Sequence, residues 1–290
     1  MHMNDGRILV ATDFSSRSDR ALRRALLLAR DLGRPLALVH VVDDDQPDRV
    51  VKAERETAAL LLHEQAQTLH RVDGVECLTR ILEGDAHEAI ADAATKLAAA
   101  LVVVGPHRRR RFKDVFVGTT AERVIRTSRC PVLVADAVPA GSYRHLLLAV
   151  DLSPASADVI RAVEALGLAR QAAITVVHAF DVFDDPRLAR ASFDPDSQQR
   201  FVDEARARAA HALDTFLAEL GFEPAVRLVR LNDSSAGHVV CDTAVEVAAD
   251  LIALGTHGRS GLDKLLLGSV AQEVLQVTTV DVLAVPPRRD

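Results

Sequence analysis

The chain alternates between short, continuous apolar runs and longer segments in which apolar residues recur with helical spacing. Ile8–Ala11 is apolar throughout and Leu36–Val42 is apolar except for His40, whereas Ser15–Leu32 between them follows the 3.6-residue period of an amphipathic helix. Apolar runs separated by helical patterns are typical of parallel strands that are covered by helices on both faces. The pattern therefore predicts an α/β fold.

The alternation continues along the whole chain. In the first half it predicts strands at Ile8–Ala11, Leu36–Val42, Glu76–Leu82, Leu101–Val104 and Val132–Ala135, and helices at Ser15–Leu32, Asp48–Arg71, Asp85–Leu97 and Thr119–Thr127. In the second half it predicts strands at Leu146–Val150, Ile174–Ala179, Ala225–Leu231, Leu251–Leu254 and Val282–Val285, and helices at Ser156–Arg170, Gln198–Leu220, Ala236–Ala248 and Val270–Val277.

The two halves are copies of one unit. "RILVATDFSS" (7–16) matches "HLLLAVDLSP" (145–154) at an offset of 138, and "LVVVGPHRR" (101–109) matches "LIALGTHGR" (251–259) at an offset of 150. The second copy therefore carries about a dozen additional residues, and segment 180–199 is their expected place. Because crossover connections are right-handed, few topologies remain. We expect two tandem, doubly wound, Rossmann-like sheets of five parallel strands each, in domains 1–138 and 143–290, joined near Asp136–Ser142.

Composition narrows the class of protein. The 290 residues are 49% hydrophobic but only 3% aromatic, and the net charge of −6 argues against a nucleic-acid-binding protein. No apolar run reaches the roughly 18 residues that span a bilayer, and no apolar signal region precedes the first strand. Three distant cysteines, Cys77, Cys130 and Cys241, form no metal-binding spacing. A cytoplasmic protein with buried, reduced thiols is expected.

Ligands of such sheets bind beyond the carboxyl ends of the strands, where the strand order reverses. Asp13 and its counterpart Asp151 follow the first strand of each copy, and Gly105 and Gly255 follow the fourth. Two interpretations of the acids are open and compatible: each contacts a ligand, or each helps a nearby serine to cap the next helix.

A glycine-rich segment follows the fourth strand of the second copy, "GTHGRSGLDKLLLGS" (255–269). Gly255 and Gly258 permit a positive φ or a close approach to a ligand. Gly268 and Ser269 start the last helix, whose free N–H groups favour an anion, and Arg259 adds positive charge. On these residues alone, a loop that simply ends in a glycine-started helix remains an alternative.

The spacing Gly255-x2-Gly258-x9-Gly268-Ser269, together with "ILVATDFS", "ALVHVV", "LLLAVDLS" and "TVVHAF", resembles the universal stress protein family, of the adenine nucleotide alpha-hydrolase-like class. The resemblance covers nearly the whole chain and implies ATP, with or without Mg²⁺, bound between the first and fourth strands. It implies that the second copy surrounds the nucleotide with Asp151, Ala179, Leu254, Gly255, Gly258, Arg259, Gly268, Ser269 and Val270.

The first copy keeps most of this pattern but not its middle glycine. Asp13, Gly105, Gly118 and Thr119 remain, whereas Arg108 stands where the second copy has Gly258. We predict that this degenerate site binds ATP poorly or not at all. Two alternatives stay open: the basic run "HRRRRFKD" recruits another anion, such as a phosphorylated metabolite or an acidic partner, or it is a solvated loop.

Other polar residues have structural interpretations. His40 and His178 lie in apolar strands and are predicted to be satisfied core histidines. His87, Glu88 and Asp92 recur in the second copy only as His238 and Asp242, so no metal site is expected.

Two functions from different classes fit the chain. One is a nucleotide-responsive, stress-response regulatory protein with little or no hydrolysis; the other is a slow ATPase or a nucleotidyl transferase. No residue stands out as a catalytic base, so the first is favoured and no catalytic residue is assigned. The resemblance also implies that "CPVLVA" and "VDVLAV" pair within the chain as a pseudo-dimer. Whether whole chains form a homodimer, and which protein partner they meet, are left open.

Overall fold

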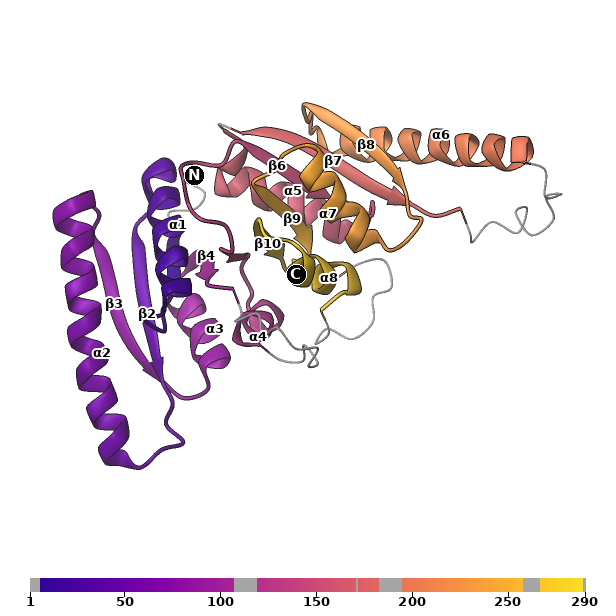
Figure 1. The fold of residues 1–290 in the computed structure, drawn as a ribbon. Coiled ribbons are helices and arrows are strands. Elements are labelled where there is room, and N and C mark those ends of the chain that lie inside the picture. Colours follow the sequence, from indigo (N-terminus) through magenta and orange to yellow (C-terminus); the bar gives the residue numbers. More distant parts are fainter. Residues whose placement is uncertain (1–5, 107–118, 171, 183–194, 258–266, 289–290) are drawn as a thin grey trace.

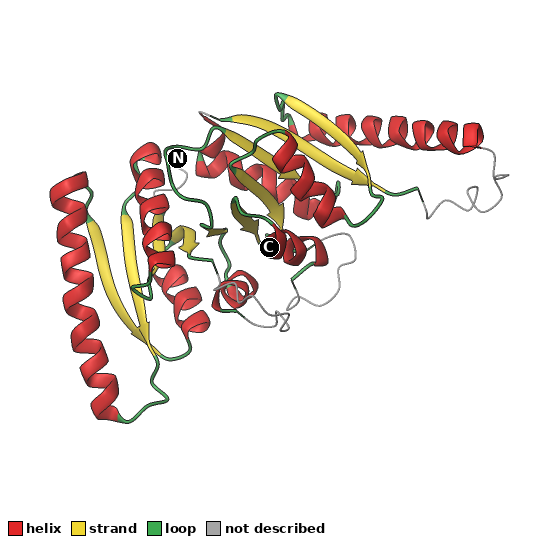
Figure 2. Ribbon diagram, viewed as in Figure 1, coloured by secondary structure: helices red, strands yellow, loops and turns green. Residues whose placement is uncertain are grey.

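The computed structural model describes residues 6–106, 119–170, 172–182, 195–257 and 267–288 (Figure 1). Helices and strands alternate through both halves (Figure 2). The first half contains β1 (Arg7–Ala11), α1 (Ser16–Leu32), β2 (Leu36–Val42), α2 (Asp48–Thr68), β3 (Cys77–Glu83), α3 (Ala86–Lys96), β4 (Ala99–Val104), α4 (Thr120–Thr127) and β5 (Val132–Val134). The second contains β6 (His145–Ala149), α5 (Pro154–Leu166), β7 (Ala173–Phe180), α6 (Pro195–Leu220), β8 (Val226–Leu231), α7 (Ala236–Glu246), β9 (Leu251–Gly255), α8 (Ser269–Val277) and β10 (Asp281–Val285).

All ten strands belong to one sheet, in the order β3-β2-β1-β4-β5-β10-β9-β6-β7-β8. Within each half the five strands are parallel. The halves meet where β5 and β10 run antiparallel, with Val134 opposite Val282 and Val132 opposite Ala284. The predicted α/β fold with two doubly wound five-stranded units is confirmed, and the expected pairing of the two last strands joins them into a continuous sheet.

The core explains why the central strands are largely apolar. The central strands are covered on both faces, and Ile8, Leu101, Leu146 and Leu251 are fully buried. One hydrophobic cluster contains these four residues together with Leu283 of β10. Because this cluster includes side chains from both halves, the junction of the two units is supported by a shared core as well as by strand pairing.

Two helices end three or more residues before the predicted position. A single helix was predicted over Ser156–Arg170, but α5 ends at Leu166 because Gly167 adopts a left-handed conformation, φ 77°, and a short 3₁₀ turn follows. The helix predicted to reach Arg71 is α-helical only to Thr68 and continues as a π-helical turn, Leu69–Asp73.

The second half has the longer connection between its second strand and the next helix, and most of the segment 180–199 predicted to hold the additional residues, 183–194, lies outside the described residues. The connection between β2 and α2 comprises residues 43–47, whereas the connection between β7 and α6 comprises residues 181–194. The two outer strands, β3 and β8, form the ends of the sheet, with α2 and α6 beside them (Figure 1). No helix in the described part of the chain combines the length and apolar character needed to cross a bilayer.

Candidate functional site

Each half has a cavity at the carboxyl ends of its strands. The cavity of the second half encloses about 140 Å³ and is lined from the ends of β6, β7 and β9 and from the starts of α5, α7 and α8. The structure brings together around it the described members of the predicted set: Asp151, Ala179, Leu254, Gly255, Gly268, Ser269 and Val270. Gly258 and Arg259 of that set lie outside the described residues.

Asp151 is held in a tight turn after β6. Leu152 has a positive φ of 63°, and the equivalent Phe14 in the first half has a φ of 58°. This conformation is unfavourable for a residue with a side chain, so its occurrence at the same place in both halves marks a constrained turn. Asp151 Oδ1 accepts hydrogen bonds from Ser153 N (3.0 Å), Ser153 Oγ (2.5 Å) and Ser156 Oγ (2.6 Å). Ser153 is itself the N-cap of α5, so the aspartate orients the capping serine.

Gly255 and Gly105 are required for a reason that differs from the prediction. Neither is among the glycines with a positive φ in the described chain. A Cβ on Gly105 would lie 3.0 Å from the carbonyl carbon and oxygen of Arg17, and one on Gly255 would lie 3.1 Å from the carbonyl oxygen of His257. Of the two reasons predicted for Gly255, the positive φ is not found, and the close approach to a ligand stays a prediction. In the structure both glycines allow the backbone to approach neighbouring protein segments closely.

The start of α8 carries unfilled hydrogen-bond donors. Gly268 is its N-cap, no side chain caps it, and its first turn contains no acidic residue. The N–H of Gly268 donates to the carbonyl of Thr256 at 2.8 Å, which fixes the start of the helix beside the end of β9. The uncapped N–H groups of the first turn, with the positive end of the helix dipole, form a favourable place for an anion.

His257 adds a further unfilled polar atom. Its Nδ1 lies 2.9 Å from the hydroxyl oxygen of Thr256. Its Nε2 is buried and has no hydrogen-bond partner among the described residues. Because buried polar atoms are normally paired, and because His257 lines the cavity, a ligand is a suitable partner for this atom.

A contact between α7 and α8 borders the same cavity and was missed by the sequence analysis. The hydroxyl of Ser235 donates to the carboxylate of Glu273 at 2.7 Å, and His238 Nδ1 pairs with Glu273 Oε1. A Cβ on Gly237 would overlap the side chain of Glu273. In the first half the corresponding contact joins Asp85 to Arg123 at 3.9 Å, so a comparison of the two copies at these positions would have indicated it.

Asn232, directly after β8, is hydrogen-bonded to the end of β7. The N–H of Asn232 donates to the carbonyl of Phe180 at 2.8 Å, and its side-chain amide donates to Asp181 Oδ1 at 2.7 Å. The equivalent glycine, Gly84, donates to Val42 at 3.1 Å and has a positive φ of 112°. The backbone pairing is therefore the same in both halves despite the change of residue.

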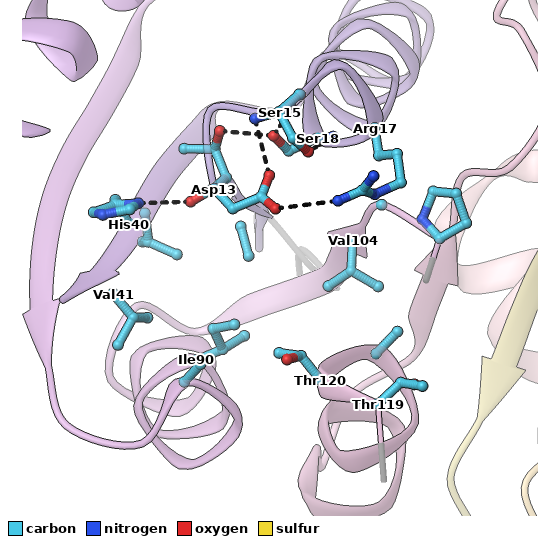
Figure 3. A pocket seen from close by; sticks show the side chains of 17 residues that line it. Asp13, Ser15, Arg17, Ser18, His40, Val41, Ile90, Val104, Thr119 and Thr120 are labelled. Carbon is cyan, nitrogen blue, oxygen red and sulfur yellow. Dashed lines mark hydrogen bonds and ion pairs between the residues drawn. The ribbon is translucent and has the colours of Figure 1, made fainter. Parts of the chain in front are cut away.

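The first-half cavity encloses about 320 Å³ and lies between β1, β2 and β4 on one side and α3 and α4 on the other (Figure 3). Asp13, Gly105 and Thr119 of the predicted degenerate site line it. Arg108 and Gly118, the other members of that site, lie outside the described residues.

The first-half cavity is the larger of the two, but the helix that starts beside it, α4, is capped differently from α8. Thr119 is the N-cap of α4, and its hydroxyl accepts the N–H of Glu122 at 3.2 Å. Glu122 also places a negative charge in the first turn. The donors that stay open at α8 are thus partly filled at α4, and the local field is less favourable for a polyanion.

The surroundings of Asp13, which lines the first-half cavity, favour the ionised form of its carboxyl group. Its Oδ1 accepts the N–H of Ser15 at 3.0 Å, and Arg17 lies 3.8 Å from its Oδ2. Burial raises the pKa of Asp13, but hydrogen bonds from Ser15 and Ser18 and the charge of Arg17 outweigh it, so the net pKa is lowered.

The strand histidines have the predicted structural role. His40 Nδ1 lies 2.8 Å from the carbonyl oxygen of Thr12, and His178 Nδ1 lies 2.9 Å from that of Val150. Both rings are buried. Among the described residues no group of three or more histidine, cysteine or acidic side chains is placed to hold a metal ion.

Comparison with known proteins identifies relatives over the whole chain. A model of the Universal stress protein family matches residues 6–136 and again 142–286. "Universal stress protein A homolog 1" of Coxiella burnetii is 36% identical over 143 residues, which are 49% of this chain and 96% of that protein. A universal stress protein of Mycolicibacterium smegmatis is 27% identical over 299 residues and covers 97% of both chains.

Solved structures share the complete two-unit architecture. A functionally unknown protein of Pseudomonas aeruginosa PAO1 superposes with a TM-score of 0.70 at 25% identity, covering 97% of this chain and 92% of that one. A universal stress protein of Archaeoglobus fulgidus superposes with a TM-score of 0.69 at 18% identity, covering 97% and 98%, and shows the shared fold.

Proposed function

Because the chain belongs to the universal stress protein family, we propose that it is a stress-response regulatory protein that binds ATP in its second half. The family membership expected from the glycine spacing is confirmed by the match in each half. The nucleotide, its site and its regulatory use are the proposal, and the features below support them.

The start of α8 is the observation that carries the proposal. Gly268 leaves the first turn of the helix without a side-chain cap, and no acid opposes an incoming negative charge. Ser269 and Val270, the first residues of the helix, line the cavity. A phosphate chain placed here would accept hydrogen bonds from backbone N–H groups that have no side-chain partner.

The remaining walls fit the other parts of a nucleotide. Ala179 and Leu254 give the inner wall an apolar surface of small and medium size, which suits a purine ring. Asp151 stands at the end of β6, where its carboxylate is fixed by Ser153 and Ser156. The buried Nε2 of His257 offers one more polar contact.

The cavity volume indicates how the ligand would lie. About 140 Å³ is below the roughly 300 Å³ of common ligand pockets, so the base and part of the sugar fill the enclosed space. The triphosphate then extends toward α8. The predicted contacts of Gly258 and Arg259 with it remain part of the proposal, and Mg²⁺ would accompany the phosphates and keep most of its water ligands.

A regulatory role is favoured over catalysis. Among the described residues that line the second-half cavity, Asp151 is the only acidic side chain and His257 the only imidazole. Asp151 Oδ1 is already engaged by three donors, which suits a fixed contact better than proton transfer. A slow ATPase or nucleotidyl transferase is the second candidate, and phosphate release at roughly 1 per second or faster would favour it.

The domain limits are proposed together with the site. Residues 1–138 and 143–290 each contain one five-stranded parallel unit with a cavity at the carboxyl ends of its strands. Binding of ATP in one unit would act on the other through the shared core and the β5–β10 pairing. Formation of a homodimer by whole chains stays a prediction.

Isothermal titration calorimetry with ATP tests the proposal on three forms of the full chain: the wild type, Gly258→Arg and Arg108→Gly. We expect about one ATP per wild-type chain and loss of that binding in Gly258→Arg. Two equal sites in the wild type would contradict the assignment to the second half. No binding at all would contradict the nucleotide itself.

A further inference from the structure

The first-half cavity contains a guanidinium that has no counterpart in the second half. Arg17 lines this cavity, whereas the repeat places Ala155 at the equivalent position. Among the described residues the only charged partner of Arg17 is Asp13, whose Oδ2 lies 3.8 Å from its NH2. This distance exceeds that of a hydrogen bond, so the donors of Arg17 stay available to a ligand.

Arg17 and Asp13 present opposite charges side by side. Their side chains are 32% and 64% exposed, and they point toward each other along the side of the cavity (Figure 3). Exposed ion pairs contribute little free energy, about 0–1 kcal/mol, so the pair can exchange its mutual attraction for ligand contacts at small cost. A simple anion would meet the negative charge of Asp13, and a simple cation would meet Arg17. A ligand carrying both charges satisfies both side chains.

The opposite wall of the cavity is partly apolar, with Thr119 and Thr120 beside the apolar side chains (Figure 3). Val41, Ile90 and Val104 face the polar residues across the opening (Figure 3). The enclosed volume of about 320 Å³ leaves room for a side chain of moderate size against this wall. The cavity therefore combines a zwitterionic mouth with a hydrophobic interior.

A nucleoside triphosphate fits this cavity less well. The start of α4 is capped by Thr119, and Glu122 adds negative charge to its first turn. Neither feature is present at α8. The start of α4 is therefore less favourable than that of α8 for several adjacent negative charges, while Arg17 offers one guanidinium to a single anionic group.

We propose that the first-half cavity binds a free α-amino acid with an apolar side chain. In such a ligand the ammonium nitrogen and the carboxylate oxygens are roughly 3 Å apart by standard bond lengths, which is close to the spacing of the Asp13–Arg17 pair. The ammonium donates to Asp13, the carboxylate accepts from Arg17, and the side chain packs on Val41, Ile90 and Val104. This ligand is separate from the ATP proposed for the second half.

Calorimetry and thermal shift on the full chain test this site with L-leucine, L-isoleucine, L-methionine and L-phenylalanine at up to millimolar concentration. At least one is expected to bind. Arg17→Ala, which reproduces the second-half residue, and Asp13→Asn should each weaken binding at least tenfold, because each removes a hydrogen bond to a charged group. Arg23→Ala is the matched control: Arg23 lies on the same helix, is 56% exposed and pairs with Asp73, so its loss should leave amino-acid binding unchanged.

Analogues distinguish the zwitterion from its parts. For the amino acid that binds, the N-acetyl form lacks the ammonium and the amide form lacks the carboxylate; both should bind at least tenfold more weakly. Equal affinity for either analogue, displacement by ATP, or failure of all four amino acids would overturn the proposal. ATP binding to the second half is measured on the same preparations, so the failure of one site is distinguishable from the failure of the other.

Discussion

The guanidinium of Arg24 lies 2.7 Å from the carboxylate of Asp281, although the two residues are 257 positions apart. Arg24 belongs to α1 of the first half and Asp281 begins β10 of the second, and both side chains are almost completely buried. Asp281 also accepts hydrogen bonds from the hydroxyl of Tyr143 at 2.6 Å and from the N–H of Ala137 at 2.9 Å. The connection between the halves is thus fixed by one carboxylate.

Arg24 also contacts the segment that joins the two halves. It donates to the carbonyl of Gly141 at 2.7 Å, and its guanidinium lies 4.2 Å above the ring of Tyr143. The charges are therefore paired and hydrogen-bonded within the interface. Burying such a pair changes the free energy of folding little while both partners are present. Removing one partner destabilises the folded state strongly, because the other charge stays buried without a counterion.

Replacement of Asp281 by Asn should lower the free energy of unfolding by about 3–5 kcal/mol, because it leaves the buried charge of Arg24 without its counterion. Urea unfolding monitored by circular dichroism measures the change. Asp203→Asn is the control, since the exposed Arg206–Asp203 pair should contribute no more than about 1 kcal/mol. Similar losses in both variants would show that burial of the Arg24–Asp281 pair is not what matters.

Tyr143 provides a second test of this interface. Burial, followed by the negative charge of Asp281, raises the pKa of Tyr143 well above its usual value. An unfolded tyrosine ionises near pH 10. Above that pH the unfolded chain loses a proton that the folded chain keeps, so the free energy of unfolding should fall as the pH rises beyond about 10.

The measurement is unusually direct because Tyr143 is the only tyrosine and the chain has no tryptophan. The ultraviolet absorbance of the phenolate should therefore appear only as the protein unfolds, above the pH at which a free tyrosine titrates. Tyr143→Phe should remove both the absorbance change and this part of the pH dependence. Reversible ionisation near pH 10 in the folded protein would show that the ring is accessible.

The interface shows what local patterns could and could not predict. The spacing of apolar residues that distinguishes strands from helices can be seen in short stretches of sequence. The predicted strand Leu36–Val42 accordingly has the observed bounds. The burial of Arg24 depends on a residue near the other end of the chain, so its helix shows no local sign of it. Asp281 stands directly before an apolar strand and has no local partner either.

The site was predictable to the extent that it repeats. Asp151 and Gly255 were identified because Asp13 and Gly105 occupy the same places, and the structure brings each pair to the corresponding cavity. Arg17 was missed because a charged residue at a helix start is usually solvated. Only the comparison with Ala155 distinguishes it, together with the fold that turns it toward Asp13.

All three cysteines should be slow to react in the folded protein. Burial raises the pKa of Cys77 and of Cys241 to about 11 and also raises that of Cys130. At pH 8, a thiol with a pKa of 11 is ionised in roughly one molecule in a thousand, and the thiolate is the reactive form. A chromogenic disulfide reagent should therefore react much faster in urea than in buffer. A thiol that reacts at the unfolded rate in buffer would disprove its burial.

Gly105→Ala should lower the free energy of unfolding by about 1–3 kcal/mol, because the new methyl group would press on the backbone of Arg17 at 3.0 Å and α1 would have to move. Gly141→Ala is the control, since nothing lies within 4 Å of its added Cβ. That variant should change the stability by less than about 1 kcal/mol. Chemical unfolding of both variants gives the comparison, and equal effects would disprove the close packing at Gly105.

Gln272→Glu should weaken ATP binding to the second half by a factor of about 2 to 30, because it places in the first turn of α8 the acid that Glu122 supplies in α4. The substitution should slightly stabilise the helix itself, since acids near a helix start interact well with its dipole. A loss of affinity without a loss of stability would therefore assign the effect to repulsion of the phosphates.

The reciprocal variant, Glu122→Gln, removes the acid from the first half and should leave this ATP affinity unchanged. Calorimetry on both variants, with unfolding measured in parallel, separates the two helix starts. Unchanged affinity in Gln272→Glu would place the phosphates away from α8. Equal weakening in both variants would instead indicate a general loss of structure, because the two substitutions change the net charge in opposite directions and α4 and α8 line different cavities.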